Sequence, residues 1–257
     1  MAEIRAKKHL GQHFLIDLEA AEKISNALSF LGYDKVLEVG PGTGVLTQFL
    51  IKKPIELHAI ELDRESIPVL HSKFPEMSSR LYNEDLLKWN EPKLLKENKF
   101  ALIGNYPYNI SSQILFWMLS KRDQIPEMVG MFQKEVGIRI ASKPGNKNYG
   151  ITSVLTQAYY EVEYLFTISP DSFLPPPRVQ SGVIRLRKKT LTPDVEYKTL
   201  ALVVKTAFNQ RRKTLRNALK SLSFDDTKFL DTVSQQRAEQ LSNDQFITLA
   251  QSLNNVV

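Results

Sequence analysis

The sequence contains no cysteine among its 257 residues. Disulfide bonds, thiolate metal sites, iron–sulfur clusters and cysteine nucleophiles are therefore excluded. It also contains no run of about 18 apolar residues, so we expect no membrane-spanning helix. The opening residues, MAEIRAKKHLGQHF, lack the apolar core of a secretory signal, and we expect a cytoplasmic protein.

Metal-ligating patterns are missing as well. The four histidines lie at positions 9, 13, 58 and 71. His9 and His13 have the i, i+4 spacing of a zinc pair, but neither the glutamate of that motif nor a third ligand accompanies them. We therefore expect no bound metal ion.

Positive charge is present in excess, with 34 Lys+Arg against 28 Asp+Glu and a formal net charge of +6. Residues 197–224 carry seven basic side chains and no acidic one. Leucines recur there with helical spacing and should turn inward, which leaves four basic residues exposed: Arg211, Arg212, Lys213 and Arg216. Such a patch suits the phosphates of a nucleic acid, or it is a solvated helix face.

Strand-like and helix-like segments alternate through the first three quarters of the chain. Short β-rich runs predict strands at 35–39, 56–61, 80–83, 100–104, 127–132, 162–168 and 183–187. Helical spacing predicts helices at 17–31, 45–51, 111–119, after 132 to about 142, and 151–160. This alternation predicts an α/β fold with a mainly parallel sheet, in which the last two strands pair antiparallel at one edge.

The pattern changes around residues 188–193, KKTLTP. The remainder of the chain has helical spacing and no strand signal. We therefore expect two domains, an α/β domain over 1–189 and a small all-helical domain over 190–257.

The strongest local signal is the segment VLEVGPGTG at 36–44, in which a buried strand runs into a glycine-rich turn. Glycine lets the backbone approach a ligand closely. Glu61 ends the next strand, where a carboxylate can accept both hydroxyls of a ribose, although an exposed strand-end acid is the alternative. Together they indicate a nucleoside cofactor. The choice between a dinucleotide and S-adenosylmethionine stays open, with the G-x-G-x-G spacing weakly against NAD.

An acid also follows the third predicted strand. Asp85 can accept a hydrogen bond from the exocyclic amine of an adenine, or it can cap a helix that begins at Leu86. The sequence favours neither reading.

Asn105-Tyr-Pro-Tyr108 follows the fourth predicted strand, at the sheet edge where open α/β folds bind ligands. The amine of a nucleobase is a poor nucleophile because its lone pair is conjugated with the ring. The Asn105 oxygen and the Pro107 carbonyl, aimed by the fixed φ of proline, can accept its two N–H bonds and localise that lone pair. Tyr108 then offers a face on which the base can stack. A plain β-turn is the alternative.

The chain resembles the ribosomal RNA adenine N6-dimethyltransferase family, and within it the bacterial small-subunit type. Two stretches carry the resemblance at the ends of the first domain, Lys8-His-Leu-Gly-Gln-His-Phe-Leu15 and Ser172-Phe-Leu-Pro-Pro-Pro-Arg-Val-Gln-Ser181. Further matches are Glu38-Val-Gly-Pro-Gly-Thr-Gly44, Glu61-Leu-Asp63, Asp85-Leu-Leu87, Asn105-Tyr-Pro-Tyr108 and Phe208-Asn-Gln-Arg-Arg-Lys-Thr-Leu-Arg-Asn217. The chain departs from the family at His13, where Asn is frequent, and at Tyr106, where Leu is frequent, so these two positions should act through backbone or packing.

The resemblance implies a Rossmann-like S-adenosylmethionine-dependent methyltransferase domain with helices on both faces of its sheet, and a helical RNA-binding domain. It implies that the cofactor is held by His13, Leu15, Gly40, Glu61, Asp85 and Asn105. It implies that the target adenine meets Asn105, Pro107 and Tyr108, with Phe173 stacking on the base opposite Tyr108. The partner would be the small ribosomal subunit with its 16S RNA, and we expect a monomer that dimethylates two adjacent adenosines during ribosome assembly.

Three other functions compete with this one. A large-subunit, macrolide-resistance dimethyltransferase is disfavoured by the Gly-Pro-Gly turn and by the basic run of the tail. A non-catalytic ribosome-assembly factor of the same fold is disfavoured by the intact Asn105, Pro107 and Tyr108. An NAD oxidoreductase is disfavoured by the glycine spacing, and a titration with S-adenosylmethionine or NADH separates the two.

Overall fold

The computed structural model describes residues 6–90, 92–224 and 228–254. The chain divides into two compact units, the first made of Met1–Gly137 and Glu163–Lys188 and the second of Ile138–Val162 and Lys189–Val257. The sequence places a single boundary near residue 190, whereas the second unit also takes in 138–162. The reason is long-range packing, because helix α7 (Ile151–Tyr159) contacts helices α8 (Tyr197–Asn209) and α11 (Asn243–Gln251).

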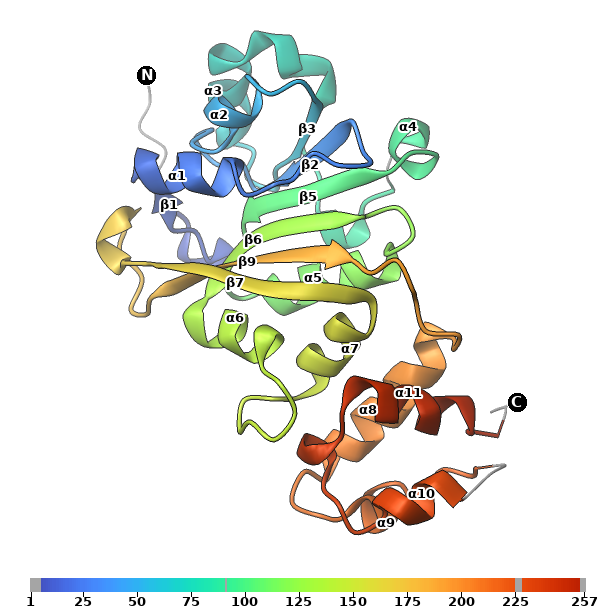
Figure 1. Ribbon diagram of the computed structural model, residues 1–257. Helices are drawn as coiled ribbons and strands as arrows, with labels where there is room; N and C mark the ends of the chain where they lie inside the picture. The colour runs from blue at the N-terminus through green and yellow to red at the C-terminus, as the bar shows by residue number, and fades with distance from the viewer. Residues whose placement is uncertain (1–5, 91, 225–227, 255–257) are drawn as a thin grey trace. The chain divides into compact units, whose positions relative to one another are not determined.

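A seven-stranded sheet runs in the order β4-β3-β2-β5-β6-β9-β7 (Figure 1). The strands from β4 to β6 are parallel, and β9 pairs antiparallel with β6. All seven strands and the mainly parallel sheet were predicted, with ends that differ by two residues or fewer. Their bounds are β2 Lys35–Val39, β3 Glu56–Ile60, β4 Leu81–Tyr82, β5 Phe100–Asn105, β6 Glu127–Gln133, β7 Tyr160–Ile168 and β9 Ser181–Lys188.

The register of the parallel strands places their carboxyl ends at one edge of the sheet. Val39 at the end of β2 lies opposite Ile60 at the end of β3, and β5 ends at Asn105. The strands are mostly apolar on both faces, as buried parallel strands are, with a few buried polar residues such as Glu38 in β2 and His58 in β3. Alternate residues such as Val36 join a core under helices α1 (Leu18–Ser25) and α2 (Thr47–Leu50), and the intervening Leu37 points to the opposite face.

Helices and short 3₁₀ turns connect these strands. The helices are α1 Leu18–Ser25, α2 Thr47–Leu50, α3 Ser66–Lys73, α4 Lys93–Lys96, α5 Ser111–Ser120 and α6 Lys134–Ala141. The 3₁₀ turns are η1 Lys8–Leu10, η2 Pro75–Arg80, η3 Leu86–Lys88 and η4 Pro170–Ser172.

Helix α1 ends earlier than the sequence predicts. It begins after its N-cap Asp17, whose side chain accepts from the Ala20 amide at 3.0 Å, but it stops at Ser25 instead of 31. The cause is the buried Glu127, whose carboxylate accepts from the Ser29 amide at 2.9 Å and from the Tyr33 hydroxyl at 2.7 Å. A partner almost 100 residues away thus outweighs the local helical pattern.

A two-stranded sheet lies outside the main one and was not predicted. Strand β1 (Phe14–Leu15) pairs antiparallel with β8 (Phe173–Leu174). Two residues per strand give too short a pattern to read from sequence. The pairing brings the segment before α1 against the proline-rich segment before β9.

The second unit is helical, as predicted for the end of the chain. Besides α7, α8 and α11 it contains α9 Leu215–Ala218, α10 Lys228–Val233 and η5 Ala238–Gln240. Within the described ranges no helix of either unit is both long and apolar enough to cross a membrane.

Candidate active site

A cavity of about 280 Å³ opens at the carboxyl edge of the parallel strands, and every lining residue belongs to the first unit. Its wall comes from five segments that are distant in sequence, 9–15, 38–46, 60–62, 84–86 and 105–110. The cavity therefore brings together the expected cofactor and base residues His13, Leu15, Gly40, Glu61, Asp85, Asn105, Pro107 and Tyr108.

The glycine-rich turn begins at Gly40, directly after β2. Gly40 has φ +68°, a left-handed conformation that side chains rarely adopt. Its amide donates to the Ile60 carbonyl at 2.9 Å, and a Cβ at this position would lie 4.0 Å from the Asn105 backbone oxygen. The glycine-rich turn thus lies beside the end of β5, next to the turn that begins at Asn105.

Glu61 is buried, with 6% of its surface exposed, which excludes an exposed strand-end acid. Its carboxylate accepts from the Gly42 amide at 2.9 Å through Oε2 and from the Asp63 amide at 2.8 Å through Oε1. Burial raises the pKa of Glu61, and these backbone hydrogen bonds oppose the rise. The carboxylate is held in one orientation and keeps further lone pairs at the cavity.

Asp85 caps the short turn η3. Its Oδ1 accepts from the Leu87 amide at 3.0 Å, so the capping alternative is observed. Asp85 also lines the cavity, and its Oδ2 lies 3.9 Å from the Lys88 ammonium. Capping therefore uses one oxygen, and the adenine contact proposed for this residue would use the other.

Glu38 is a cavity residue that the sequence reasoning did not assign. It is 1% exposed in the middle of β2, and its Oε2 accepts from the Thr47 hydroxyl at 2.7 Å. Burial raises the pKa of Glu38 to about 8, with the nearby Glu61 adding to the rise. The position of Glu38 between Leu37 and Val39, in a strand that the sequence predicts to be buried, is the sequence feature that could have identified it.

Glu38→Gln should stabilise the protein increasingly as pH rises. Between the ordinary pKa of 4.5 and about 8, the folded state holds a proton at Glu38 that the unfolded state has lost, so parental stability falls with pH across this window. The glutamine resembles the protonated carboxyl at every pH. We expect melting temperatures to agree at pH 5 and the variant to melt at least about 2 °C higher at pH 9. A difference that does not change with pH would contradict this assignment.

Asn105 at the end of β5 has its side-chain amide fixed by the N-terminal segment. Its Nδ2 donates to the His13 carbonyl at 2.9 Å. A carbonyl can only accept, so the amide nitrogen must face it, and Oδ1 stays outside this bond as an acceptor at the cavity. His13 acts here through its backbone, as the departure from the family pattern suggested.

The two residues after Tyr106 complete this wall. The Pro107 carbonyl accepts from the Ile110 amide at 3.1 Å, which leaves one of its lone pairs. The Tyr108 hydroxyl bonds to the Ser181 hydroxyl at 2.6 Å, and burial raises the pKa of Tyr108, so the phenol stays neutral. One face of the Tyr108 ring stacks on His13, with centroids 5.6 Å apart.

Phe173 lies elsewhere than the resemblance implied. Its side chain is 2% exposed within the core that also contains Leu15, its partner in the β1–β8 pairing. Among the described residues it is not part of the cavity wall. The strand pairing turns this ring into the core, so it has no open face for a base opposite Tyr108.

Phe173→Ala should therefore act mainly on stability. Truncating a buried phenylalanine costs about 3–5 kcal/mol of unfolding free energy. Phe173→Leu, which keeps most of the packing volume, should retain methyl transfer. Denaturant unfolding and transfer assays of both variants check this, and a stable Phe173→Leu without activity would restore the base-stacking role.

Three of the four basic tail residues are exposed as expected, namely Arg212, Lys213 and Arg216. Arg211 is different. Its Nε lies 2.6 Å from the Glu239 carboxylate, and the guanidinium also donates to the Lys147 carbonyl. Arg211 thus ties together segments of the second unit, a contact that its sequence neighbours do not reveal.

Comparison with known proteins identifies the family of this chain. The family described as ribosomal RNA adenine dimethylase matches residues 3–255. A protein of Flavobacterium johnsoniae named ribosomal RNA small subunit methyltransferase A is 52% identical over 98% of this chain and 97% of its own length. A protein of the same name from Porphyromonas gingivalis is 52% identical over 97% of this chain and 98% of its own length.

Solved structures share the fold. A dimethyladenosine transferase from Plasmodium falciparum superposes with a TM-score of 0.78 at 25% identity, covering 92% of this chain and 96% of that chain. The 23S rRNA methyltransferase ErmE superposes with a TM-score of 0.72 at 23% identity, covering 94% and 100%. A match over nearly the whole sequence excludes the oxidoreductase reading: this chain belongs to the ribosomal RNA adenine dimethylase family and is an rRNA adenine dimethyltransferase.

Proposed function

We propose that the protein dimethylates N6 of two adjacent adenosines in 16S RNA of the small ribosomal subunit, with S-adenosylmethionine as the methyl donor. The relatives named ribosomal RNA small subunit methyltransferase A support the small subunit as substrate. The proposed substrate also places the protein in the cytoplasm during ribosome assembly, and we propose that it acts as a monomer.

The orientation of the Asn105 amide carries the proposed chemistry. Because its nitrogen is held by the His13 carbonyl, its oxygen can accept an N–H of the target amine. The Pro107 carbonyl can accept the second N–H with its remaining lone pair. These two bonds localise the lone pair of the amine, so the site needs no strong general base. A base must leave its stack to reach such a pocket.

The residues present fit the proposed cofactor. Glu61 offers fixed carboxylate oxygens for a ribose, and Asp85 offers one for an adenine amine. When bound, S-adenosylmethionine supplies an electrophilic methyl group on a sulfonium. The chain's part is to hold the amine and the donor in line, which makes catalysis mostly a matter of positioning.

Transfer of labelled methyl groups to isolated ribosomal subunits tests the substrate. The subunits come from a strain that lacks this modification, and small and large subunits are assayed in parallel. We expect label in the small subunit only. Label in the large subunit would instead support a large-subunit enzyme, and labelling of neither by a protein that binds the donor would support a non-catalytic assembly factor.

The exposed basic residues of the tail should set affinity for the RNA. Replacing Arg212, Lys213 and Arg216 by glutamine should weaken subunit binding. The slope of the logarithm of the binding constant against the logarithm of the salt concentration should become less steep by roughly two to three units. Affinity for S-adenosylmethionine should not change, because the cavity lies within the first unit.

A matched control removes the same charge elsewhere. Lys23, Lys52 and Lys99 are exposed lysines of the first unit outside the cavity wall. Their replacement by glutamine should leave the slope near the parental value. Equal slopes for the tail variant and the parent would mean that the basic patch is a solvated face.

A further inference from the structure

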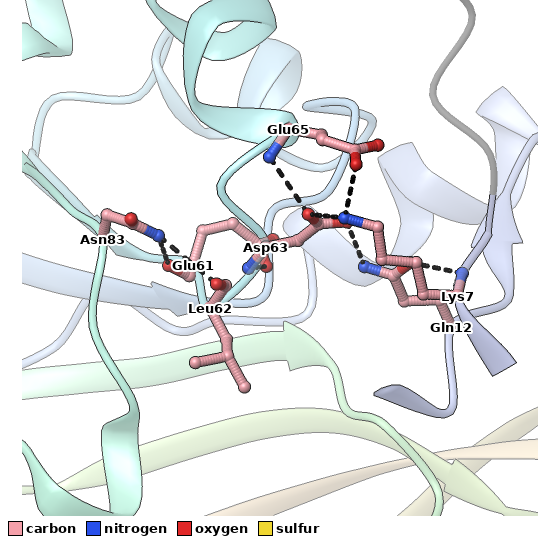
Figure 2. A network of polar contacts seen from close by, with 7 residues as sticks. All are labelled: Lys7, Gln12, Glu61, Leu62, Asp63, Glu65 and Asn83. Atoms are coloured by element: carbon pink, nitrogen blue, oxygen red, sulfur yellow. Dashed lines mark hydrogen bonds and ion pairs between the residues drawn. The ribbon is translucent and has the colours of Figure 1, made fainter. Parts of the chain in front are cut away.

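A polar network beside the cavity holds the N-terminal segment in place (Figure 2). Asp63 lies at its centre, 2% exposed and outside the cavity wall among the described residues. Its Oδ1 lies 2.6 Å from the Lys7 ammonium, and its Oδ2 accepts from the Gln12 side chain at 2.9 Å. Burial raises the pKa of Asp63, but the hydrogen bonds from Lys7, Gln12 and the Glu65 amide, together with the Lys7 charge, outweigh burial and lower the pKa.

The same network reaches the candidate cofactor site. The Asp63 amide donates to Glu61 Oε1, the carboxylate proposed to hold the ribose. Gln12 in turn accepts from the Lys7 amide at 2.8 Å, so one side chain links both ends of the segment. Residues 7–13, here called the strap, are therefore fastened at Lys7 and Gln12 to the loop after β3.

The other end of the strap contacts the catalytic turn. The His13 carbonyl accepts from the Asn105 amide at 2.9 Å. At Gly11 the strap backbone has φ +65°, and a Cβ there would lie 2.6 Å from Oδ1 of Asn109. The strap thus spans the cavity wall from the Glu61 loop to the Asn105 turn, with polar contacts at each end.

We propose that Asp63, through its bonds to Lys7 and Gln12, is a positioning residue that holds the His13 carbonyl where it orients the Asn105 amide. The inference rests on the proposed role of Asn105. Asp63 touches neither the donor nor the base in this account. It acts on the rate of transfer because a strap that is released at Lys7 and Gln12 lets the His13 carbonyl move. The Asn105 amide is then free to rotate its oxygen away from the target amine.

Single-turnover transfer at saturating RNA and S-adenosylmethionine tests this, since saturation removes effects on affinity. Asp63→Asn and Lys7→Met should each lower the rate on the order of tenfold or more, because small displacements of a catalytic group are costly. The variant that carries both substitutions should transfer no more slowly than the slower of the two single variants, since both substitutions break the same contact. Lys7→Arg keeps the ion pair and should retain the parental rate.

Lys23→Met is the matched control, because it breaks a 2.6 Å ion pair with Glu19 on an exposed helix face away from the cavity wall. It should leave the rate unchanged. Lys7→Met removes a partly exposed side chain and keeps the test available if Asp63→Asn does not fold. Hydrogen exchange should accelerate in the amides of residues 9–13 of the folded Lys7→Met protein.

The outcomes separate this inference from the proposed role of Asn105. A parental rate for Lys7→Met, or losses that multiply in the double variant, would overturn the positioning role of Asp63. If Asn105→Ala also transferred at the parental rate, the role of Asn105 itself would fail. Slow transfer by Asn105→Ala together with parental transfer by Lys7→Met would leave that role intact and reject the strap alone.

Discussion

Asn105→Ala is expected to lower single-turnover methyl transfer on the order of 100-fold or more, with little change in RNA binding. The bond from the amine to Asn105 Oδ1 strengthens as the nitrogen becomes tetrahedral, so its loss falls on the transition state. Losing one such preorganised hydrogen bond in an active site typically costs this much in rate. The hydrogen bond to the His13 carbonyl holds the Asn105 amide in this orientation.

Rapid-quench transfer at saturating donor and RNA measures this effect. Asn90→Ala is a suitable control, because Asn90 is exposed, bonds to Lys96 and lies outside the cavity wall. Thermal unfolding of both variants shows whether the fold is intact. A near-parental rate for a folded Asn105→Ala would reduce Asn105 to a turn residue.

Glu61→Ala should weaken S-adenosylmethionine binding by about 1.5–3 kcal/mol, the usual worth of hydrogen bonds to a charged group. This corresponds to roughly 10- to 150-fold in Kd. The loss has two sources, because Glu61 would bond the ribose and also fixes the amides of Gly42 and Asp63. Glu61→Gln keeps one acceptor and should fall between the parent and the alanine variant.

Calorimetric titration of the purified variants checks this order. Glu76→Ala provides the control, since Glu76 is an exposed acid of η2 outside the cavity wall. It should bind the donor as the parent does. Unchanged affinity in folded Glu61→Ala would remove Glu61 from the cofactor site.

Most of the sheet and much of the cavity wall could be predicted because their signals are local. The apolar runs of β2 and β5 and the turn at Gly40 each lie within a few residues. The carboxyl ends of parallel strands share one edge, so Glu61 and Asn105 were both expected at that edge. That topology, together with the family resemblance, is why the predicted residues converge in one cavity.

The features that could not be predicted depend on partners far along the chain. Helix α1 stops early because Glu127 binds the following loop. Phe173 is buried because β8 pairs with β1, and Arg211 is engaged because Glu239 lies beside it. The contact between Lys7 and Asp63 spans 56 residues, and neither residue type signals the other.

The identity of the methylated nucleoside tests the central claim most directly. Unmodified small subunits are incubated with the enzyme and labelled S-adenosylmethionine, and their RNA is then digested to nucleosides and separated. The account predicts that all label enters N6,N6-dimethyladenosine, with two such nucleosides per particle. It also predicts that Asn105→Ala yields almost none of this nucleoside in the same time. Label in any other nucleoside, or equal yields from Asn105→Ala and the parent, would contradict it.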